Sequence, residues 1–513
     1  MRCSLAGEMS IGQTNQARFR GKPTLRAGGA CARPTGEGRS GYSRAGFFAS
    51  RRWAAVQFWQ PISTDDANLL SASAMTDQTA PASAASKPAS AASDPALAAT
   101  GPADLGSHFA ERVALYFGAV FLVFGVHLTY FPVWLASRGL TPEQIGLLTA
   151  LPIILRAILT PIIGAYADAT GRHRTLVVAL SAASAVLAIA AWNAPSYGWL
   201  VVTVIPYSVI AVSVLPLIDT VAVAGVRAAG HNYGRMRLWG SLTFLIATLA
   251  AGAMIDIWGA RAIIWALVGA TIATAIAALM LPHPQLDTAT RTAPLTANGT
   301  ALTTTRRQNA YREGSRSTAG AVGALMTQPV FVLFIVAVGA IQASHAAFYT
   351  FGALHLQGQG VSGSAFGTLW AVAIIAEIVL LGWSAPFIAK LGAVRLLILG
   401  GVAAIIRWSM MSIDPPYAAV FALQILHGAT YAATHLGAMH FIAKAVPEGA
   451  SGTAQSLYSS VGSGLMTAAA VYFAGLAYPS MAGQTYLLMG ALAFAGTAAA
   501  ITVHRTWNGR ALV

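Results

Sequence analysis

Long apolar runs constrain the fold of this chain more than any other feature of its sequence. Twelve such runs, each close to 20 residues or longer, follow residue 110. In a bilayer every backbone N–H and C=O group must be satisfied internally, and an α-helix of about 20 apolar residues crosses the hydrocarbon core. Charged residues make up only 9% of the chain, against about 25% in soluble domains. The sequence therefore predicts an all-α membrane protein.

The apolar runs form two sets of six, and a polar segment rich in Thr and Arg separates the two sets. In the first set we expect membrane spans at about 113–136, 143–166, 175–193, 198–224, 237–256 and 261–281. In the second set we expect spans at about 329–356, 363–387, 394–412, 416–445, 452–477 and 483–503. These boundaries predict an N-terminal half at 110–281, a cytoplasmic linker at 282–328 and a C-terminal half at 329–513.

Residues 1–109 precede the first span and differ from the rest of the chain in composition. They are rich in Ala, Ser, Gly, Pro and Arg and show no sustained periodicity, so we expect a disordered tail. Two interpretations of this tail remain open. The Arg-rich stretch that ends at Trp53 is faintly similar to a transit peptide, or the true start of the protein lies near Met75.

An internal repeat relates the two halves. A shift of 221 residues places Gly146 on Gly367 and Arg156 on Glu377 without a gap. Each copy thus carries one ionisable residue at the same depth of an apolar span. A charge at the centre of a membrane helix costs about 2.5–3.5 kcal/mol on insertion scales, so it requires a partner or a function. Duplicated halves with polar residues near the midplane are typical of secondary transporters.

Loop charges predict the orientation of the spans. Basic residues gather in alternate loops: Arg172, Arg174, Arg227, Arg235, Arg237, Arg291, Arg306, Arg307, Arg312, Arg316, Lys390, Arg395, Lys444, Arg505 and Arg510. The other loops hold only Arg138 and Arg261. The positive-inside rule therefore places both termini and the linker in the cytoplasm. The net charge of +14 follows from these scattered loops, so we expect no nucleic-acid partner.

Four ionisable residues stand out inside the predicted spans: Arg156, Asp219, Glu377 and Arg407. Such residues either form structural ion pairs or line a polar cavity, and two opposite pairs favour a cavity. Pro216 just before Asp219 frees backbone groups in its span, which fits a cavity as well.

Histidine and aromatic residues repeat at helical spacing in three spans. Gln424, His427, Tyr431 and His435 share one face of a helix; Gln342, His345 and Tyr349 repeat the pattern; His127, Tyr130 and Trp134 share another face. A lone membrane histidine is most often a hydrogen-bonded core residue. Two matching stripes indicate cavity lining instead, and histidine changes charge near neutral pH, which suits a proton-coupled step.

The sequence does not support a metal site, a cofactor site or an enzyme active site. The histidines are too far apart along their helix for one metal ion, and the two cysteines, Cys3 and Cys31, lie in the tail. No phosphate-binding Gly-x-x-x-x-Gly-Lys-Ser/Thr sequence occurs. We therefore expect no metal site, no cofactor and no catalytic residue.

Several motifs resemble a known family. Gly164, Asp168, Gly171, Arg172 and Arg174 form a degraded copy of the loop signature of the major facilitator superfamily. Further stretches resemble its phenylpropionate permease-like group, near the nucleoside and lactose proton symporters: Leu215–Asp219, Tyr233–Ser241, Gln342–Tyr349, Ala376–Glu377, Arg407–Trp408, Gln424–His427 and His435–Met439. The resemblance implies a major facilitator fold, in which twelve transmembrane helices form two pseudo-symmetric six-helix bundles. We also expect a multi-pass protein of the bacterial inner membrane.

The resemblance also implies roles for individual residues. The substrate-binding set is expected to contain Arg156, His127, Tyr130, Gln342, His345, Tyr349, Trp370 and Tyr431. The proton-coupling set is expected to contain Asp219, Glu377, Arg407, His427 and His435. Conformational gating is expected from Asp168, Gly171, Arg172, Arg174, Arg235 and Arg237. In the lactose permease an acid, an Arg and a His are distributed over three neighbouring spans, and Glu377, Arg407 and His427 fill these positions here.

The function implied is proton-coupled import of a small organic solute by alternating access, with an aromatic carboxylate such as a phenylpropionate-like acid as the expected substrate. Its partners are then the solute, protons and the lipid bilayer, and a monomer is expected. Arg156 or Arg407 would bind the carboxylate, and Phe348, Tyr349, Trp370 or Tyr431 would flank the ring. A nucleoside or sugar symporter, a non-transporting sensor or scaffold, and a membrane-embedded enzyme are the alternatives.

Overall fold

The computed structural model describes residues 108–229, 231–282 and 320–512, and in these residues it contains helices and no strand. All of them belong to one compact unit. The predicted disordered tail lies outside the described residues except for its last two positions, and so does most of the predicted linker. Residues 320–326, which the sequence analysis assigned to the linker, are helical.

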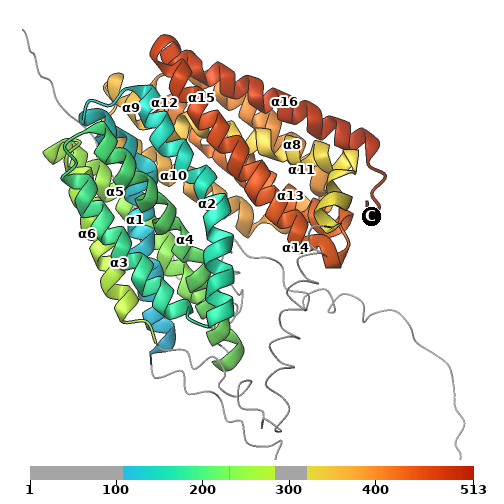
Figure 1. The fold of residues 1–513 in the computed structure, drawn as a ribbon. Helices are drawn as coiled ribbons and strands as arrows, with labels where there is room; N and C mark the ends of the chain where they lie inside the picture. Colours follow the sequence, from blue (N-terminus) through green and yellow to red (C-terminus); the bar gives the residue numbers. More distant parts are fainter. Residues whose placement is uncertain (1–107, 230, 283–319, 513) are drawn as a thin grey trace, which may run out of the picture. The chain divides into compact units, whose positions relative to one another are not determined.

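Six helices build the N-terminal half (Figure 1). They are α1 (Phe109–Ser137), α2 (Pro142–Thr170), α3 (His173–Trp192), α4 (Tyr197–Ala229), α5 (Tyr233–Trp258) and α6 (Ala262–Leu279). Local sequence explains where α2 starts and stops. Thr141 and Gln144 form a reciprocal capping box before it, and Gly171 ends it in the left-handed conformation, with φ 67°.

The C-terminal half also contains six spans, but several are interrupted. Span 7 comprises α8 (Pro329–Ala343) and α9 (Ala346–Gly358), span 8 is α10 (Gly363–Gly382), span 9 is α11 (Ser384–Met411), and span 12 is α16 (Thr485–Thr506). Span 10 comprises α12 (Tyr417–Ile425), the π-helix η3 (Gly428–Ala433) and α13 (Thr434–Ala445). Span 11 comprises α14 (Glu448–Leu457), the π-helix η4 (Tyr458–Leu465) and α15 (Met466–Met481).

The predicted number of spans is confirmed. Ten helical runs among the described residues are long and apolar enough to cross a membrane. The last of them, Glu448–Thr506, contains two spans that meet at the short 3-10 helix η5 (Ala482–Gln484). Dividing this run, and adding the interrupted span 10, gives twelve.

Three of the predicted spans contain interruptions that the sequence did not reveal. Span 7 breaks at Ser344 and His345, and spans 10 and 11 each pass through a π-helix. Span 9 joins a short preceding helix at Gly392, where φ is 71° and ψ is 174°. Apolar periodicity indicates which residues avoid water. A segment with a π-turn or a break is as apolar as a regular helix, so the apolar pattern could not reveal these interruptions. π-helices occur frequently at functional sites.

The contacts between helices repeat from one half to the other. In the N-terminal half spans 1–5, 1–6, 2–4, 3–4 and 3–6 pack together, and in the C-terminal half spans 7–11, 7–12, 8–10, 9–10 and 9–12 do so. Between the halves, span 2 packs on span 11 and span 5 packs on span 8. The repeat relates each span of one half to the span six positions away in the other half. This relation converts the contact of spans 2 and 11 into the contact of spans 8 and 5, so the packing has the two-fold pseudo-symmetry that the repeat predicts.

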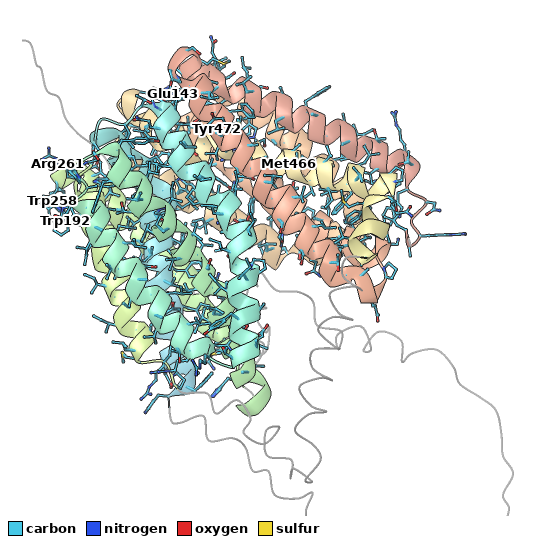
Figure 2. All side chains as sticks on the ribbon, in the orientation of Figure 1. Glu143, Trp192, Trp258, Arg261, Met466 and Tyr472 are labelled. Atoms are coloured by element: carbon cyan, nitrogen blue, oxygen red, sulfur yellow. The ribbon has the colours of Figure 1, made fainter. Side chains whose placement is uncertain are left out.

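The two ends of the bundle differ in charge. We call the end with the α2–α3 loop the basic end, because it carries Arg172, Arg174, Arg235, Lys390, Arg395 and Lys444. Figure 2 shows Glu143, Trp192, Trp258 and Arg261 projecting at the opposite end of the N-terminal half. Figure 1 shows α2 and α15 side by side near this opposite end, while α2 and α14 diverge toward the basic end.

Candidate functional site

A group of buried polar residues occupies the middle of the C-terminal half; we call it the central cluster, and it comprises His345, Glu377, Arg407, Gln424, His427 and Thr430. Arg407 on α11 is 0% exposed. Its Nη2 donates to Gln424 Oε1 at 2.6 Å, and its Nη1 donates to His427 Nδ1 at 3.1 Å. The guanidinium also lies over the Trp408 ring, 4.5 Å from its centroid, and 5.3 Å from the Phe348 centroid. Neighbouring groups therefore enclose Arg407.

Glu377 on α10 faces the same cluster. It is 4% exposed, and its Oε2 lies 3.8 Å from His427 Nε2. A guanidinium can only donate, so the bond from Arg407 requires an unprotonated Nδ1 on His427. A neutral His427 then carries its proton on Nε2, the atom that faces Glu377. The arrangement places a carboxylate, an imidazole and a guanidinium in a row on three neighbouring spans.

Thr430 in η3 connects this row to His345. His345 Nδ1 lies 3.0 Å from the Gln342 carbonyl oxygen, which can only accept, so Nδ1 is the donor. In the neutral tautomer His345 Nε2 then accepts from the Thr430 hydroxyl at 2.9 Å. Arg407 Nη1 donates to the same hydroxyl at 3.4 Å. The break in span 7 exposes the Gln342 carbonyl to this bond, so the irregular helix is what orients the histidine.

Aromatic rings cover the central cluster. Tyr431 stacks on His427, with ring centroids 5.4 Å apart and planes 17° apart. Tyr349 lies 5.4 Å from Trp370, and Trp370 in turn lies 6.1 Å from Phe348 and 6.5 Å from Phe244. Phe244 belongs to α5 in the other half, so the aromatic layer spans the junction between the halves.

Arg156 on α2 lies across the junction from the central cluster. It interacts electrostatically with His127 of its own half and with Tyr431 of the C-terminal half. It is half-buried, and within the described residues it forms no salt bridge. The two candidate carboxylate ligands thus differ. Arg407 is enclosed by its own half, whereas the guanidinium of Arg156 retains free donors as far as the described part of the chain shows.

His127 and Tyr130 on α1 were both predicted to bind substrate, but they lie in different surroundings. His127 stacks on Phe131 at 4.6 Å and lies 3.3 Å from the Ser208 hydroxyl. Tyr130 is fully buried, and its hydroxyl donates to the Gly363 carbonyl of α10 at 2.8 Å. In this conformation Tyr130 therefore joins the two halves near the opposite end.

Asp219 is separate from the central cluster. It accepts a hydrogen bond from the Tyr233 hydroxyl at 2.8 Å and interacts electrostatically with Arg237. Arg237 is 6% exposed and lies 3.9 Å from the centroid of the Phe121 ring. The sequence analysis placed Asp219 in the coupling set and Arg237 in the gating set, whereas the structure brings them together within the N-terminal half.

His435 and Gln342, at the ends of the two predicted stripes, meet at Tyr458 in η4. His435 Nδ1 lies 2.9 Å from the Tyr458 hydroxyl, and Gln342 is a further hydrogen-bonding neighbour of that hydroxyl. Tyr431 lies within the π-helix η3, and His435 follows the end of η3 and contacts span 11 through Tyr458. The helical spacing predicted for span 10 assumed one regular α-helix, and that assumption is wrong because η3 interrupts the helix.

The predicted gating residues make contacts within the N-terminal half. Asp168 Oδ1 lies 2.9 Å from His173 Nε2. Arg174 donates to the carbonyls of Leu281 at 2.7 Å and Leu279 at 3.0 Å, which terminate α6. Arg172 and Arg235 are exposed at the basic end. Asp168 and Arg174 thus stabilise the loop locally in this conformation.

Sequence reasoning missed four residues of the site: Thr430, Phe244, Tyr458 and Tyr233. Thr430 and Phe244 carry no distinctive sequence signal, because each is an ordinary residue in an apolar span. Tyr458 could have been found, since a tyrosine in a run of serines, from Ser456 to Ser460, is unusual in a membrane span. Tyr233 follows a loop, and only the fold reveals its position beside Asp219.

Comparison with known proteins agrees with the fold. A family model described as the MFS_1 like family matches residues 113–488. The chain is 27% identical over 382 residues to the probable 3-phenylpropionic acid transporter of Escherichia coli (strain K12), which covers 74% of this chain and 94% of that protein. It is 30% identical over 363 residues to the maltose permease of Geobacillus stearothermophilus, which covers 68% of this chain and 83% of that protein.

Solved structures show the same architecture. The nucleoside transporter NupG superposes with a TM-score of 0.66 at 15% identity, covering 78% of this chain and 100% of that one. A D-xylose-proton symporter superposes with a TM-score of 0.54 at 12% identity, covering 79% of this chain and 99% of that one. At these identities the likeness concerns the fold alone.

Proposed function

Because the chain belongs to the MFS_1 like family of secondary transporters, and is therefore a multi-pass membrane carrier rather than an enzyme, we propose that it imports an aromatic monocarboxylate together with a proton. The observation that carries this proposal is Arg156: a half-buried cation with free donors, positioned at the junction of the halves beside Tyr431. A charge at that depth needs a partner, and a carboxylate forms paired hydrogen bonds with a guanidinium.

The surroundings of Arg156 support an aromatic substrate. Tyr431, Tyr349, Trp370 and Phe348 supply flat apolar surfaces on the C-terminal side of the junction. Stacked or edge-to-face aromatic pairs contribute about 0.5–1.5 kcal/mol each beyond burial. A molecule with a ring and a carboxylate separated by a short chain would contact Arg156 and this aromatic layer at once. His127, Gln342 and His345 complete the proposed substrate-binding set. Tyr130 would influence substrate binding indirectly, because it joins the two halves.

Glu377 supplies a physical basis for proton coupling. Tyr431 interacts electrostatically with both Arg156 and Glu377, so the two charges belong to one electrostatic environment. A substrate carboxylate at Arg156 adds a second negative charge to that environment, and like charges disfavour each other. Substrate binding is therefore favoured when Glu377 is protonated, and protonation of Glu377 is favoured when substrate is bound. Arg407 and His427 would position and stabilise the carboxylate after the proton leaves.

Alternating access provides the transport step. We propose that the basic end is cytoplasmic, in accord with the positive-inside rule, and that the opposite end, where Tyr130 joins the halves, is the closed end in the conformation described here. Rocking of the two halves about the junction would then move access from one side to the other. Asp168, Gly171, Arg172, Arg174 and Arg235 would engage across the basic end in the other conformation, and Asp219 with Arg237 would stabilise the N-terminal half. The bacterial inner membrane and a monomeric carrier fit this proposal.

A sugar or nucleoside substrate is the second candidate, because the maltose permease and the nucleoside transporter NupG are among the similar proteins. Such substrates are neutral, so they would leave the charge of Arg156 without a counter-ion. The carboxylate reading is therefore preferred.

Uptake into proteoliposomes tests the proposal. Purified carrier would be reconstituted and offered labelled 3-phenylpropionate, cinnamate, benzoate, uridine and maltose, with and without an imposed pH gradient. We expect accumulation of aromatic acids above the equilibrium level only when the gradient is present. Accumulation of uridine or maltose without that of any aromatic acid would overturn the substrate assignment, and accumulation independent of the gradient would overturn proton coupling.

A further inference from the structure

A single acidic residue joins the halves at the opposite end. Asp256 lies near the end of α5, and its Oδ1 accepts a hydrogen bond from the Gly363 N–H at 2.6 Å. Its Oδ2 accepts from the Ser364 N–H at 2.8 Å. These are the first N–H groups of α10, which lack partners inside their own helix. A carboxylate at this position is also favoured by the helix dipole, so one side chain from the N-terminal half caps a helix of the C-terminal half.

Glycine residues allow the close approach that this cap requires. A Cβ atom at Gly252 would lie 2.5 Å from the Gly363 carbonyl oxygen, and a Cβ atom at Gly363 would lie 2.5 Å from the Gly252 carbonyl oxygen. Both distances are far below van der Waals contact with rigid backbone. The Tyr130 hydroxyl donates to the Gly363 carbonyl at 2.8 Å in the same place. Helices α5 and α10 thus touch backbone to backbone next to Asp256.

The pseudo-symmetric contact between spans 2 and 11 is also close. A Cβ atom at Gly146 would lie 3.0 Å from the Gly475 Cα atom, and the reciprocal distance is also 3.0 Å. These two close junctions between the halves therefore lie at the same end of the bundle. Of these two junctions, as the described residues show them, the one between α5 and α10 carries an ionisable side chain, Asp256, that bonds across it.

The sequence around Asp256 occurs a second time in the same half. Span 5 contains Gly252-Ala-Met-Ile-Asp256, and span 2 contains Gly164-Ala-Tyr-Ala-Asp168. The two spans run in opposite directions, so the copies lie at opposite ends of the bundle. Asp256 bonds across the junction, whereas the Asp168 side chain is 74% exposed and bonds to His173 within its own loop. A Cβ atom at Gly164 would meet no atom within 4 Å, in contrast to Gly252.

We propose that Asp256 is a conformational latch, which holds the opposite end closed by capping α10 and must release Gly363 and Ser364 before substrate can enter from that side. The proposal rests on the alternating-access fold and is independent of the substrate and of the coupled ion. Asp256 is exposed, so release transfers the two N–H groups of α10 to water and leaves the carboxylate hydrated. The latch therefore sets the ratio of the two conformations without contacting the transported molecule.

Distance measurements on the intact chain test the latch. The native cysteines Cys3 and Cys31 would be replaced by Ser, and spin labels attached to cysteines at exposed positions. One pair, at Ser196 and Ser480, reports on the opposite end, and a second pair, at Thr175 and Glu448, reports on the basic end. Both pairs join the N-terminal half to the C-terminal half. Pulsed electron paramagnetic resonance then gives the population of each separation.

The informative substitution is Asp256→Asn, with Asp168→Asn as the matched control. Asn keeps the size of the side chain but loses the charge and one acceptor oxygen, so we expect about a tenfold rise in the ratio of open to closed opposite ends. The Thr175–Glu448 distance should shorten in the same molecules. Asp168→Asn should not increase opening of the opposite end. Equal opening in both variants, or an unchanged Ser196–Ser480 distribution in Asp256→Asn, would overturn the proposal.

A second variant addresses the contact itself and guards against misfolding. Gly252→Ala places a methyl group against the Gly363 carbonyl and should also open the opposite end, whereas Gly164→Ala should leave it closed. Melting temperatures in detergent identify any variant that is merely unstable. Unchanged opposite-end distances in a stably folded Gly252→Ala variant would contradict the assigned junction.

Discussion

Replacement of Arg156 by Gln gives the most direct test of the proposed carboxylate site. Gln has a similar length and can still donate hydrogen bonds, but it has no charge and no paired donors. Because Arg156 has no salt-bridge partner within the described residues, its loss leaves no other ionised group unpaired. The substitution should therefore affect the substrate more than the fold.

The expected magnitude follows from the chemistry of the lost contact. A hydrogen bond to a charged group contributes about 1.5–3 kcal/mol, and each 1.36 kcal/mol corresponds to a factor of about ten. We therefore expect kcat/KM for 3-phenylpropionate to fall about 10- to 150-fold in Arg156→Gln. Arg156→Lys keeps the charge but loses the bidentate geometry, so its activity should lie between those of the native chain and Arg156→Gln.

The assay compares a charged substrate with a neutral analogue of the same shape. Initial rates of entry into proteoliposomes would be measured for 3-phenylpropionate, and inhibition constants would be measured for 3-phenylpropan-1-ol. The alcohol should compete almost equally well with native and variant carriers, because it makes the aromatic contacts alone. A parallel loss of acid transport and alcohol affinity would refute the reasoning and would assign Arg156 a structural role.

Three further substitutions test other parts of the site. Glu377→Gln should abolish accumulation driven by a pH gradient while substrate exchange at equal pH continues, because a permanently neutral side chain cannot carry the proton; a preserved gradient response would remove Glu377 from coupling. Tyr431→Phe keeps the ring that stacks on His427 and should raise KM by less than about tenfold. Tyr431→Ala should raise KM further, because the aromatic packing is lost. Equal effects of the two substitutions on KM would contradict a role for the ring. Asp219→Asn leaves the buried Arg237 without its nearby acid and should lower the melting temperature in detergent more than Tyr233→Phe does; a larger loss with Tyr233→Phe would show that the hydroxyl, rather than the charge, stabilises this group.

The architecture could be predicted from the sequence because the bilayer allows few backbone conformations. An apolar run of about 20 residues has one stable conformation in hydrocarbon, and the repeat that pairs Arg156 with Glu377 specifies how two such sets are related. Positions of the spans were therefore predictable to within a few residues. The breaks were not, because Ser344, His345 and the residues of η3 are compatible with a continuous helix and only tertiary hydrogen bonds select the interrupted form.

The sequence predicted which residues belong to the candidate site, but not which of these residues contact each other. Glu377, Arg407 and His427 were expected together and lie together. Asp219 and Arg237 were assigned to different roles, although they are neighbours, because 18 residues and a loop separate them in the chain. Helical spacing predicts which side chains share a face, whereas the partner of a charge depends on which helices pack together, and that information is not local.

The different environments of the two arginines follow from this distinction. In sequence, Arg156 and Arg407 look equivalent, because each lies in the interior of an apolar span. In the fold, span 9 packs only within its own half, so Arg407 is enclosed by Gln424, His427 and Trp408. Span 2 lines the junction that must open and close, so Arg156 cannot be enclosed by permanent partners without locking the carrier. A free cation on a span at the junction is thus the expected consequence of alternating access with an anionic substrate, and it is the reason why Arg156 rather than Arg407 is assigned to the carboxylate.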